Sequence, residues 1–359
     1  MPSERDWNNG LCETGLAEKD LRKTPIDPDF WYPIARSKDL RREKMISVHF
    51  AGAPILLARP KSDKVFALEN RCAHRQVPLS SGVLSDCSVK CGYHGWEYDS
   101  SGRCTSIPYV DKNKRKPNGV RAYPVKEAYG LIFLFPGDAK LANSIPFPKI
   151  PSATDDDYKT RYLDRRVGCH YSFMHENLMD MNHQFLHRRL MGGIRTILLD
   201  VREGKNWVEA DYTFTRSSGR QPLGEKFMLG ERPATSANQR DLMTIRTTYP
   251  YQTLKFWTAG SEQPALDLWN AYIPLDAEQR TNHTFGLMMI KRPKVGILLD
   301  FFWPMIVWFT NGIFAEDREI CELEQAAFDR QGQDDNQEIF PAINSLRKVL
   351  RENGLGERT

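Results

Sequence analysis

The chain has 359 residues, of which 40% are hydrophobic, so its composition supports a buried core and argues against a disordered protein. Its length exceeds that of one typical domain and predicts two. The 50 Lys and Arg residues nearly balance the 46 Asp and Glu residues, and the net charge is +4. The two signs are interleaved along the chain, which argues against a dedicated nucleic-acid-binding protein.

The first segment, residues 1–28, is polar and has no apolar stretch of the kind found in signal peptides. We interpret it as a flexible lead. Seven cysteines in a chain of this length do not form the dense pattern of a disulfide framework. We therefore expect a cytoplasmic protein with reduced thiols.

Short apolar runs typical of strands follow at 46–50, 54–58, 64–68 and 125–135. A turn signal at 136–138, the prolines within 146–151 and the three aspartates at 155–157 then mark a linker. The pattern predicts a small all-β domain over residues 29–150.

Two loops in this domain each carry one cysteine and one histidine, as Cys72-Ala-His74 and Cys91-Gly-Tyr-His94. Two thiolates and two imidazoles can hold one tetrahedral zinc ion. They can also hold a [2Fe–2S] cluster in which the cysteines bind one iron and the histidines the other. Zinc modules usually pair like residues, whereas here each loop mixes the two types, so that each loop can reach both irons. The spacing favours the cluster, with a structural zinc site as the alternative.

A second group of metal-binding side chains follows the linker. His183 and His187 are four residues apart, so on a helix they project from one face and can hold one metal ion. Asp180 lies three residues before His183 and shares that face. Its carboxylate can accept a hydrogen bond from the ring nitrogen that does not bind metal.

The rest of the chain alternates strand and helix signals. Runs typical of an antiparallel sheet lie at 207–214, 242–248, 253–257, 266–273 and 284–290, and a closing helix is predicted at 346–352. The polar segment 217–240 is predicted to be a loop at the site entrance. The helical stretch 314–325 offers Glu316, Asp317 and Glu319 as a third metal ligand, and spacing alone does not choose among them.

These motifs are similar to those of a known family. The two Cys/His loops, with Leu79-Ser80-Ser81-Gly82 between them and Gly95-Trp96 after them, resemble the Rieske domain of the Rieske non-heme iron oxygenases. Residues 177–187 resemble the family motif N-x2-D-x2-H-x3-4-H, in which many members have one more residue between the histidines. The resemblance implies an α+β protein, with an N-terminal all-β Rieske domain at 29–150 and a helix-grip catalytic domain, an antiparallel sheet around a helix, at 151–359.

The resemblance also implies the ligands of two cofactors. The [2Fe–2S] cluster is expected on Cys72, His74, Cys91 and His94. A mononuclear Fe(II) is expected on His183, His187 and Asp317, because the family takes its third ligand from the Asp at the start of such an acidic helix. Asn177 is expected near this iron.

In the family, the Asp that matches Asp180 links the iron site to the Rieske histidine of a neighbouring subunit. The resemblance therefore implies that Asp180 couples His183 to His94 of the next chain in a head-to-tail trimer. The chain has no dinucleotide-binding fingerprint, so electrons for O2 are expected from a separate NAD(P)H-dependent reductase, directly or through a ferredoxin. We expect a small organic substrate to be hydroxylated or demethylated. A cis-dihydroxylating oxygenase is the alternative, and a Rieske electron carrier without oxygenase activity is the alternative of another class.

The apolar stretch 295–314 is long enough to span a membrane, but Asp300, Pro304 and Asn311 interrupt it, and Asp317 follows directly. We therefore expect a buried helix that lines the pocket or a subunit contact, in preference to membrane contact. Its Phe and Trp residues suggest a bulky apolar substrate.

Overall fold

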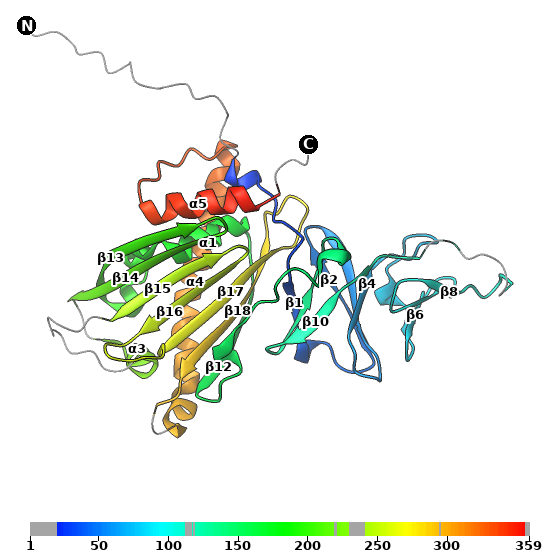
Figure 1. Ribbon diagram of the computed structural model, residues 1–359, viewed down its shortest axis with the longest axis horizontal. Helices are drawn as coiled ribbons and strands as arrows, with labels where there is room; N and C mark the ends of the chain where they lie inside the picture. Colours follow the sequence, from blue (N-terminus) through cyan, green and yellow to red (C-terminus); the bar gives the residue numbers. More distant parts are fainter. Residues whose placement is uncertain are drawn as a thin grey trace, which may run out of the picture.

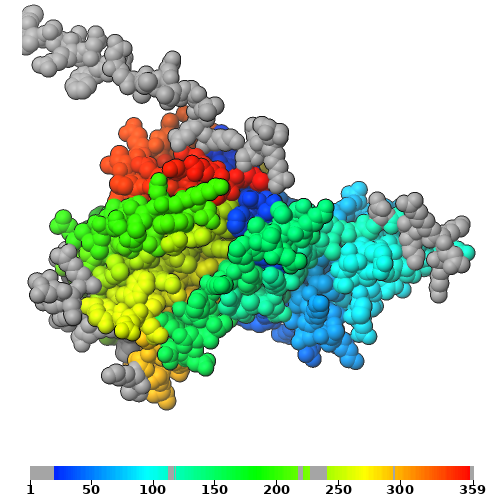
Figure 2. Space-filling model, viewed as in Figure 1, coloured from blue at the N-terminus to red at the C-terminus, as the bar shows by residue number. Residues whose placement is uncertain are grey.

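Two lobes lie side by side in the computed structural model, which describes residues 20–111, 117, 119–218, 221–229, 241–293 and 296–355 (Figures 1 and 2). The smaller lobe contains short strands in small sheets, and the larger lobe contains one broad sheet with the long helices. The architecture is the α+β arrangement expected from the sequence. Residues 1–19, the beginning of the predicted lead, lie outside the described residues.

The smaller lobe is built from antiparallel sheets of short strands. One sheet has the order β1-β11-β10, a second β2-β3-β4-β9, and a third, which lies farthest from the larger lobe, β5-β6-β7-β8 (Figure 1). The strands are β1 (Tyr32–Arg36), β2 (Lys44–Phe50), β3 (Ala53–Arg59), β4 (Phe66–Glu69), β5 (Val83–Leu84), β6 (Ser88–Lys90), β7 (Glu97–Asp99), β8 (Cys104–Ser106), β9 (Ala122–Tyr123), β10 (Val125–Ala128) and β11 (Leu131–Leu134). The predicted strands at 46–50, 54–58 and 64–68 are confirmed as β2, β3 and β4. The run at 125–135 is a hairpin, because Tyr129 and Gly130 take positive φ angles of 54° and 69° and turn the chain.

The larger lobe is organised by an antiparallel sheet with the order β12-β18-β17-β16-β15-β14-β13. Its strands are β12 (Tyr158–Val167), β13 (Gly193–Gly204), β14 (Trp207–Ser218), β15 (Leu242–Thr248), β16 (Tyr251–Trp257), β17 (Leu266–Pro274) and β18 (Asn282–Lys291). β14 to β18 were predicted. β12 was not, because its sequence carries five charged residues and shows no apolar run. It pairs with β18 along its whole length.

Helices pack along this sheet (Figure 1). They are α1 (Tyr171–Met179), α2 (Arg188–Met191), α3 (Leu223–Leu229), α4 (Ile297–Gln331) and α5 (Pro341–Asn353), and short 3-10 turns are η1 (Leu21–Lys23), η2 (Ser37–Asp39), η3 (Leu79–Ser81), η4 (Ala139–Leu141), η5 (Pro151–Ala153) and η6 (Met181–Phe185). α5 has Pro341 in its first turn and buries Ile343, Leu346, Val349 and Leu350, the spacing of an amphipathic helix. The segment 217–240 was predicted to be a loop, but the structure has the helix α3 within it. Residues 219–220 and 230–240 of this segment lie outside the described residues.

The apolar stretch 297–314 forms the first half of α4, which also carries Asp317. One side of this half is buried through Leu299, Ile306 and Phe309, whereas Phe301 and Trp308 on the other side are 75% and 69% exposed. The expectation of a buried helix is therefore correct for one side only. Within the described residues, α4 is the one helix that is long and apolar enough to cross a membrane, by length and composition alone.

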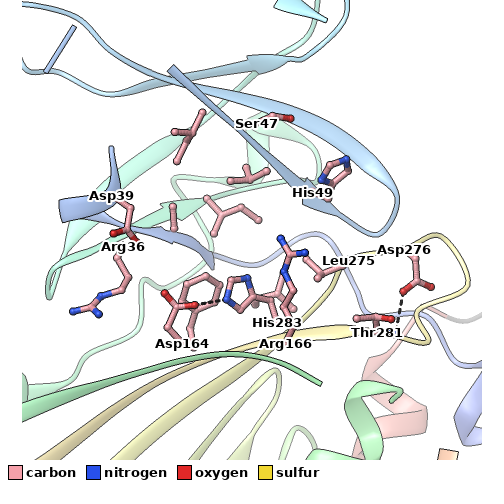
Figure 3. Close-up of a pocket in the computed structure, with 16 residues that line it drawn as sticks. Arg36, Asp39, Ser47, His49, Asp164, Arg166, Leu275, Asp276, Thr281 and His283 are labelled. Atoms are coloured by element: carbon pink, nitrogen blue, oxygen red, sulfur yellow. Dashed lines mark hydrogen bonds and ion pairs between the residues drawn. The ribbon is translucent and has the colours of Figure 1, made fainter. Parts of the chain in front are cut away.

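A cavity of about 420 Å³ lies between the two lobes (Figure 3). Charged groups of both signs line it, among them Arg36 and the hydrogen-bonded pair His283 and Asp164. None of the seven predicted metal ligands lines this cavity.

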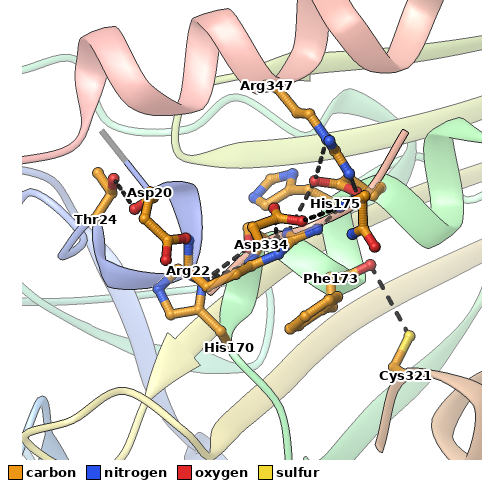
Figure 4. A network of polar contacts seen from close by, with 12 residues as sticks. Asp20, Arg22, Thr24, His170, Phe173, His175, Cys321, Asp334 and Arg347 are labelled. Atoms are coloured by element: carbon orange, nitrogen blue, oxygen red, sulfur yellow. Dashed lines mark hydrogen bonds and ion pairs between the residues drawn. The ribbon is translucent and has the colours of Figure 1, made fainter. Parts of the chain in front are cut away.

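The N-terminal segment around Arg22 is fastened to the larger lobe (Figure 4). Leu21 and Arg22 are buried, and the Arg22 guanidinium lies 3.8 Å from the ring centroid of Phe173. Arg22 forms an ion pair of 2.8 Å with Glu176 of α1, and Arg347 of α5 forms another of 2.9 Å with the same carboxylate. Residues 20–28 were predicted to be part of a flexible lead. That prediction is wrong from Asp20 onward, because tertiary partners far along the chain hold this polar segment.

Candidate metal centres

The first predicted centre lies at the far end of the smaller lobe. Cys72 and His74 follow β4, and Cys91 and His94 lie between β6 and β7. Both cysteines are buried, at 2% and 4% exposure, and the two imidazole centroids are 4.6 Å apart. The structure thus brings the four residues together from two loops. His74 Nδ1 is buried and makes no hydrogen bond to any described residue, so this ring nitrogen is available to bind a metal.

The surroundings of these loops suit a metal cluster. Tyr98 Oη lies 3.2 Å from Cys72 Sγ and accepts a hydrogen bond of 3.0 Å from the Ala73 amide. Trp96 stacks on His74 with ring centroids 4.9 Å apart and planes at 1°. Burial raises the pKa of the Cys91 thiol, so a thiolate there needs a nearby cation, which a metal would supply. Burial and the neighbouring His74 lower the pKa of His94, which favours the neutral ring that binds metals.

The second predicted centre lies in the larger lobe. Ligand atoms of His183, His187 and Asp317 lie within 4.8 Å of one another. His187 Nε2 and His183 Nε2 are 3.2 Å and 3.7 Å from Asp317 Oδ1. His187 Nε2 and Asp317 Oδ1 are both buried, and neither makes a hydrogen bond to a described residue. Two imidazoles and one carboxylate with unsatisfied inward atoms fit a non-heme Fe(II) ion, which keeps further positions open.

The protonation of the two rings also fits this role. Burial lowers the pKa of His183 below its usual range, which keeps the ring neutral. Burial acts in the same direction on His187, but the carboxylates of Asp317 and Glu316 outweigh it and raise the pKa. A metal ion would take the place of that proton between His187 and Asp317.

The local structure differs from the single helix that the spacing of the histidines predicts. α1 ends at Met179, η6 carries His183, and His187 immediately precedes α2. Asp180 breaks the helix, because its backbone is extended and its carboxylate accepts hydrogen bonds of 2.9 Å from the Asn182 backbone amide and side chain. His183 Nδ1 instead contacts the backbone carbonyl of Asp180. The predicted hydrogen bond from His183 to the Asp180 carboxylate is therefore wrong.

Comparison with known proteins identifies the family of this chain. Residues 30–124 match the model of the Rieske [2Fe-2S] domain, and residues 167–348 match that of the vanillate O-demethylase oxygenase C-terminal domain. The chain is 33% identical over 353 residues to the 4beta-methylsterol monooxygenase of Methylococcus capsulatus, covering 93% of this chain and 90% of that protein. The chain belongs to the Rieske oxygenases. This Rieske oxygenase is also 35% identical over 159 residues to the dicamba O-demethylase oxygenase component of Stenotrophomonas maltophilia, covering 44% of this chain and 47% of that one.

Solved structures share the fold of this Rieske oxygenase. Dicamba monooxygenase bound to 3,6-dichlorosalicylic acid superposes with a TM-score of 0.73 at 24% identity, covering 91% of this chain and 97% of that one. The family models and the sequence relatives above show that the protein is an oxygenase component of the O-demethylase type. Its cofactors are a Rieske [2Fe–2S] cluster and a mononuclear non-heme iron.

The other candidate site residues of this Rieske oxygenase, Glu316, Glu319 and Asn177, have different surroundings. Glu316 contacts the other ring nitrogen of His187 at 2.8 Å, whereas Glu319 is exposed on α4. Asn177 is half-buried in the last turn of α1. Sequence reasoning did not assign a role to Tyr98, which contacts Cys72. The signal available was its place two residues after Trp96, in the segment that follows His94.

Proposed function

We propose that this Rieske oxygenase transfers one oxygen atom from O2 to a methyl group, or another C–H bond, of a bulky apolar substrate. The observation that carries the proposal is the convergence of His183, His187 and Asp317, with their ligand atoms within 4.8 Å and two of those atoms buried and unsatisfied. These three residues would hold the iron, and Cys72, His74, Cys91 and His94 would hold the cluster. When bound, the iron supplies the site of O2 activation and the cluster supplies single electrons.

The residues next to the triad in the sequence include apolar side chains. Met181 is buried, and Leu190, Ile313 and Phe314 are half-buried and pack against the same large core cluster. Such side chains exclude water and select substrates by shape and apolar area. The full-length similarity to a methylsterol monooxygenase supports a polycyclic substrate of that class, with a methyl group as the position of attack. Monooxygenation is accordingly favoured over cis-dihydroxylation.

The proposal includes partners. The cluster loops lie at the end of the smaller lobe remote from the larger lobe, whose η6 and α4 carry His183 and Asp317, so one chain does not bring its two centres side by side (Figure 1). The half-exposed Asp180 and His94 support a head-to-tail trimer in which these residues of neighbouring subunits meet. A separate NAD(P)H-dependent reductase, alone or with a ferredoxin, would supply the electrons, and a cytoplasmic location suits such a system.

The experiment combines metal analysis with turnover. Protein purified without air should contain about three irons and about two acid-labile sulfides per chain. With a reductase, NAD(P)H and isotopically labelled O2, a 4-methylsterol should gain one labelled oxygen atom on the methyl carbon. A cluster without the third iron, even after Fe(II) is added back, would favour the electron-carrier alternative. Two labelled hydroxyl groups on adjacent carbons would favour the dihydroxylating one.

A further inference from the structure

The two histidines of the triad are held in the same way but by different groups. Each presents Nε2 toward Asp317 Oδ1, and each has Nδ1 against an oxygen atom. For His183 that oxygen is the backbone carbonyl of Asp180. For His187 it is a carboxylate oxygen of Glu316, at 2.8 Å. Since a carbonyl or a carboxylate can only accept, both contacts place a proton on Nδ1 when the ring is neutral.

We propose that Glu316 is a positioning residue of the mononuclear iron site, which holds His187 in the tautomer that leaves Nε2 free for the metal. The proposal rests on the proposed ligand set His183, His187 and Asp317. It gives Glu316 a role different from the one left open by its position in the sequence, where it competes with Asp317 as a ligand.

The helix geometry makes this role specific. Glu316 and Asp317 are consecutive residues of α4, so their side chains point about 100° apart around the helix axis. The His187 ring lies between them, with Glu316 at Nδ1 and Asp317 at Nε2. α4 therefore contacts the ring at both nitrogens. The His187 side chain is only 2% exposed, so water has little access to replace either contact.

The competing tautomer shows why the acceptor matters. Without Glu316, the Nδ1 proton of His187 has no carboxylate to bind. The proton is then better placed on Nε2, where Asp317 Oδ1 lies 3.2 Å away and can accept it. That arrangement occupies both a nitrogen and an oxygen that the iron needs. Removal of an acceptor that orients a metal-binding histidine typically weakens metal affinity about 10-fold to 100-fold.

The test measures metal affinity rather than turnover. Protein that keeps its cluster but has lost the mononuclear iron is titrated anaerobically with Fe(II) against a chromogenic chelator. A parallel titration with Co(II) follows the visible absorption of the bound ion. Glu316→Ala should weaken Fe(II) binding about 10-fold to 100-fold and change the Co(II) spectrum. Glu316→Gln, which keeps an acceptor oxygen, should restore most of the affinity.

The controls separate a positioning role from other roles. Glu319→Ala removes the same charge from the exposed side of α4 and should leave the affinity unchanged. Cluster content and thermal unfolding should be the same in all variants. An unchanged affinity in Glu316→Ala would overturn the proposal. Loss of metal from both Glu316 variants together with retention in Asp317→Ala would make Glu316 the ligand. If wild type, His187→Ala and Asp317→Ala all bind Fe(II) equally, the proposed ligand set itself fails.

Discussion

His183 and Asp180 are joined through the backbone: the imidazole Nδ1 contacts the Asp180 carbonyl oxygen, while the Asp180 carboxylate accepts from Asn182. The orientation of His183 therefore does not depend on the Asp180 side chain. The carboxylate is half-exposed and does not hold the iron ligand His183 in place. A role in linking the site to a neighbouring subunit and a role in holding iron can thus be separated by substitution.

Asp180→Asn should retain the mononuclear iron and the cluster and lose most turnover. The carbonyl contact to His183 is unchanged, whereas the negative charge proposed to bridge to His94 of the next subunit is lost. Metal content measures retention of the iron and the cluster. Single-turnover oxidation of the reduced cluster measures electron transfer between the centres, and steady-state turnover measures the overall activity. Full activity in this variant would remove the bridging role.

Asp317→Ala should lose the mononuclear iron and keep the cluster, because the two centres lie in different lobes (Figure 1). His187→Ala should behave in the same way. The measured iron content should fall from about three to about two irons per chain, and the sulfide content should be unchanged. Retention of the third iron in Asp317→Ala would point to another carboxylate on α4.

The cluster loops could be found from the sequence because their information is local. Each loop contains its own cysteine and histidine, and short strands return the chain from one loop to the other. The fold class followed from the same motifs and is confirmed. The third carboxylate could not be chosen from spacing, because helical periodicity tells which residues share a face but not where that face points. Only the packing of α4 against His187 shows that Glu316 and Asp317 meet different nitrogens of one ring.

Two further predictions from the sequence differ from the structure, namely the helix through His183 and His187 and the flexible segment around Arg22. The spacing of His183 and His187 predicts a helix, yet α1 ends at Met179, four residues before His183, where Asp180 caps the following turn. The polar segment around Arg22 has no local signal for order. Its partner Glu176 lies 154 residues away in the sequence, so the ion pair exists only in the folded chain.

Tyr98→Phe should lower the reduction potential of the cluster. When Cys72 ligates iron it carries no proton, so Tyr98 Oη, at 3.2 Å, must donate the hydrogen bond to the sulfur. Hydrogen bonds to cluster sulfur atoms favour the reduced, more negative state and raise the potential. A redox titration followed by electron paramagnetic resonance measures the shift. Tyr109→Phe, which removes only the acceptor of the Trp96 indole, serves as the matched control. Equal potentials in wild type and Tyr98→Phe would show that this bond does not tune the cluster.

Glu176→Gln should strongly destabilise the larger lobe. The carboxylate is buried between Arg22 and Arg347, and its removal leaves two buried guanidinium groups without that charge. Breaking such a buried pair costs about 3–5 kcal/mol in the free energy of unfolding. Chemical denaturation at neutral pH measures it. Glu203→Gln removes an exposed ion pair with Lys348 and should cost at most about 1 kcal/mol. Similar losses in the two variants would contradict the assigned role of the network.

The stability of the protein should also fall on acidification through two buried histidines. Burial lowers the pKa of His170 and His175 from 6.5 to about 3, so both rings are neutral in the fold. An unfolded chain takes up protons on both rings once the pH falls below 6.5, whereas the folded chain does not. The contribution of these two rings to stability is therefore fully present above this pH, and each ring removes about 1.4 kcal/mol per pH unit as the pH falls toward 3.

His175→Phe tests this origin of the acid sensitivity. The His175 ring packs edge-on against Tyr272 with centroids 4.8 Å apart, a position in which another aromatic ring can pack. The variant should lower the slope of unfolding free energy against pH by about 1.4 kcal/mol per pH unit between pH 6.5 and 4.5. Below pH 4.5 a further loss should remain, because Arg22 and Arg347 outweigh the effect of burial and hold the pKa of Glu176 below its ordinary 4.5, so its stabilising charge is lost there. An unchanged slope between pH 6.5 and 4.5 would assign the acid sensitivity to other groups.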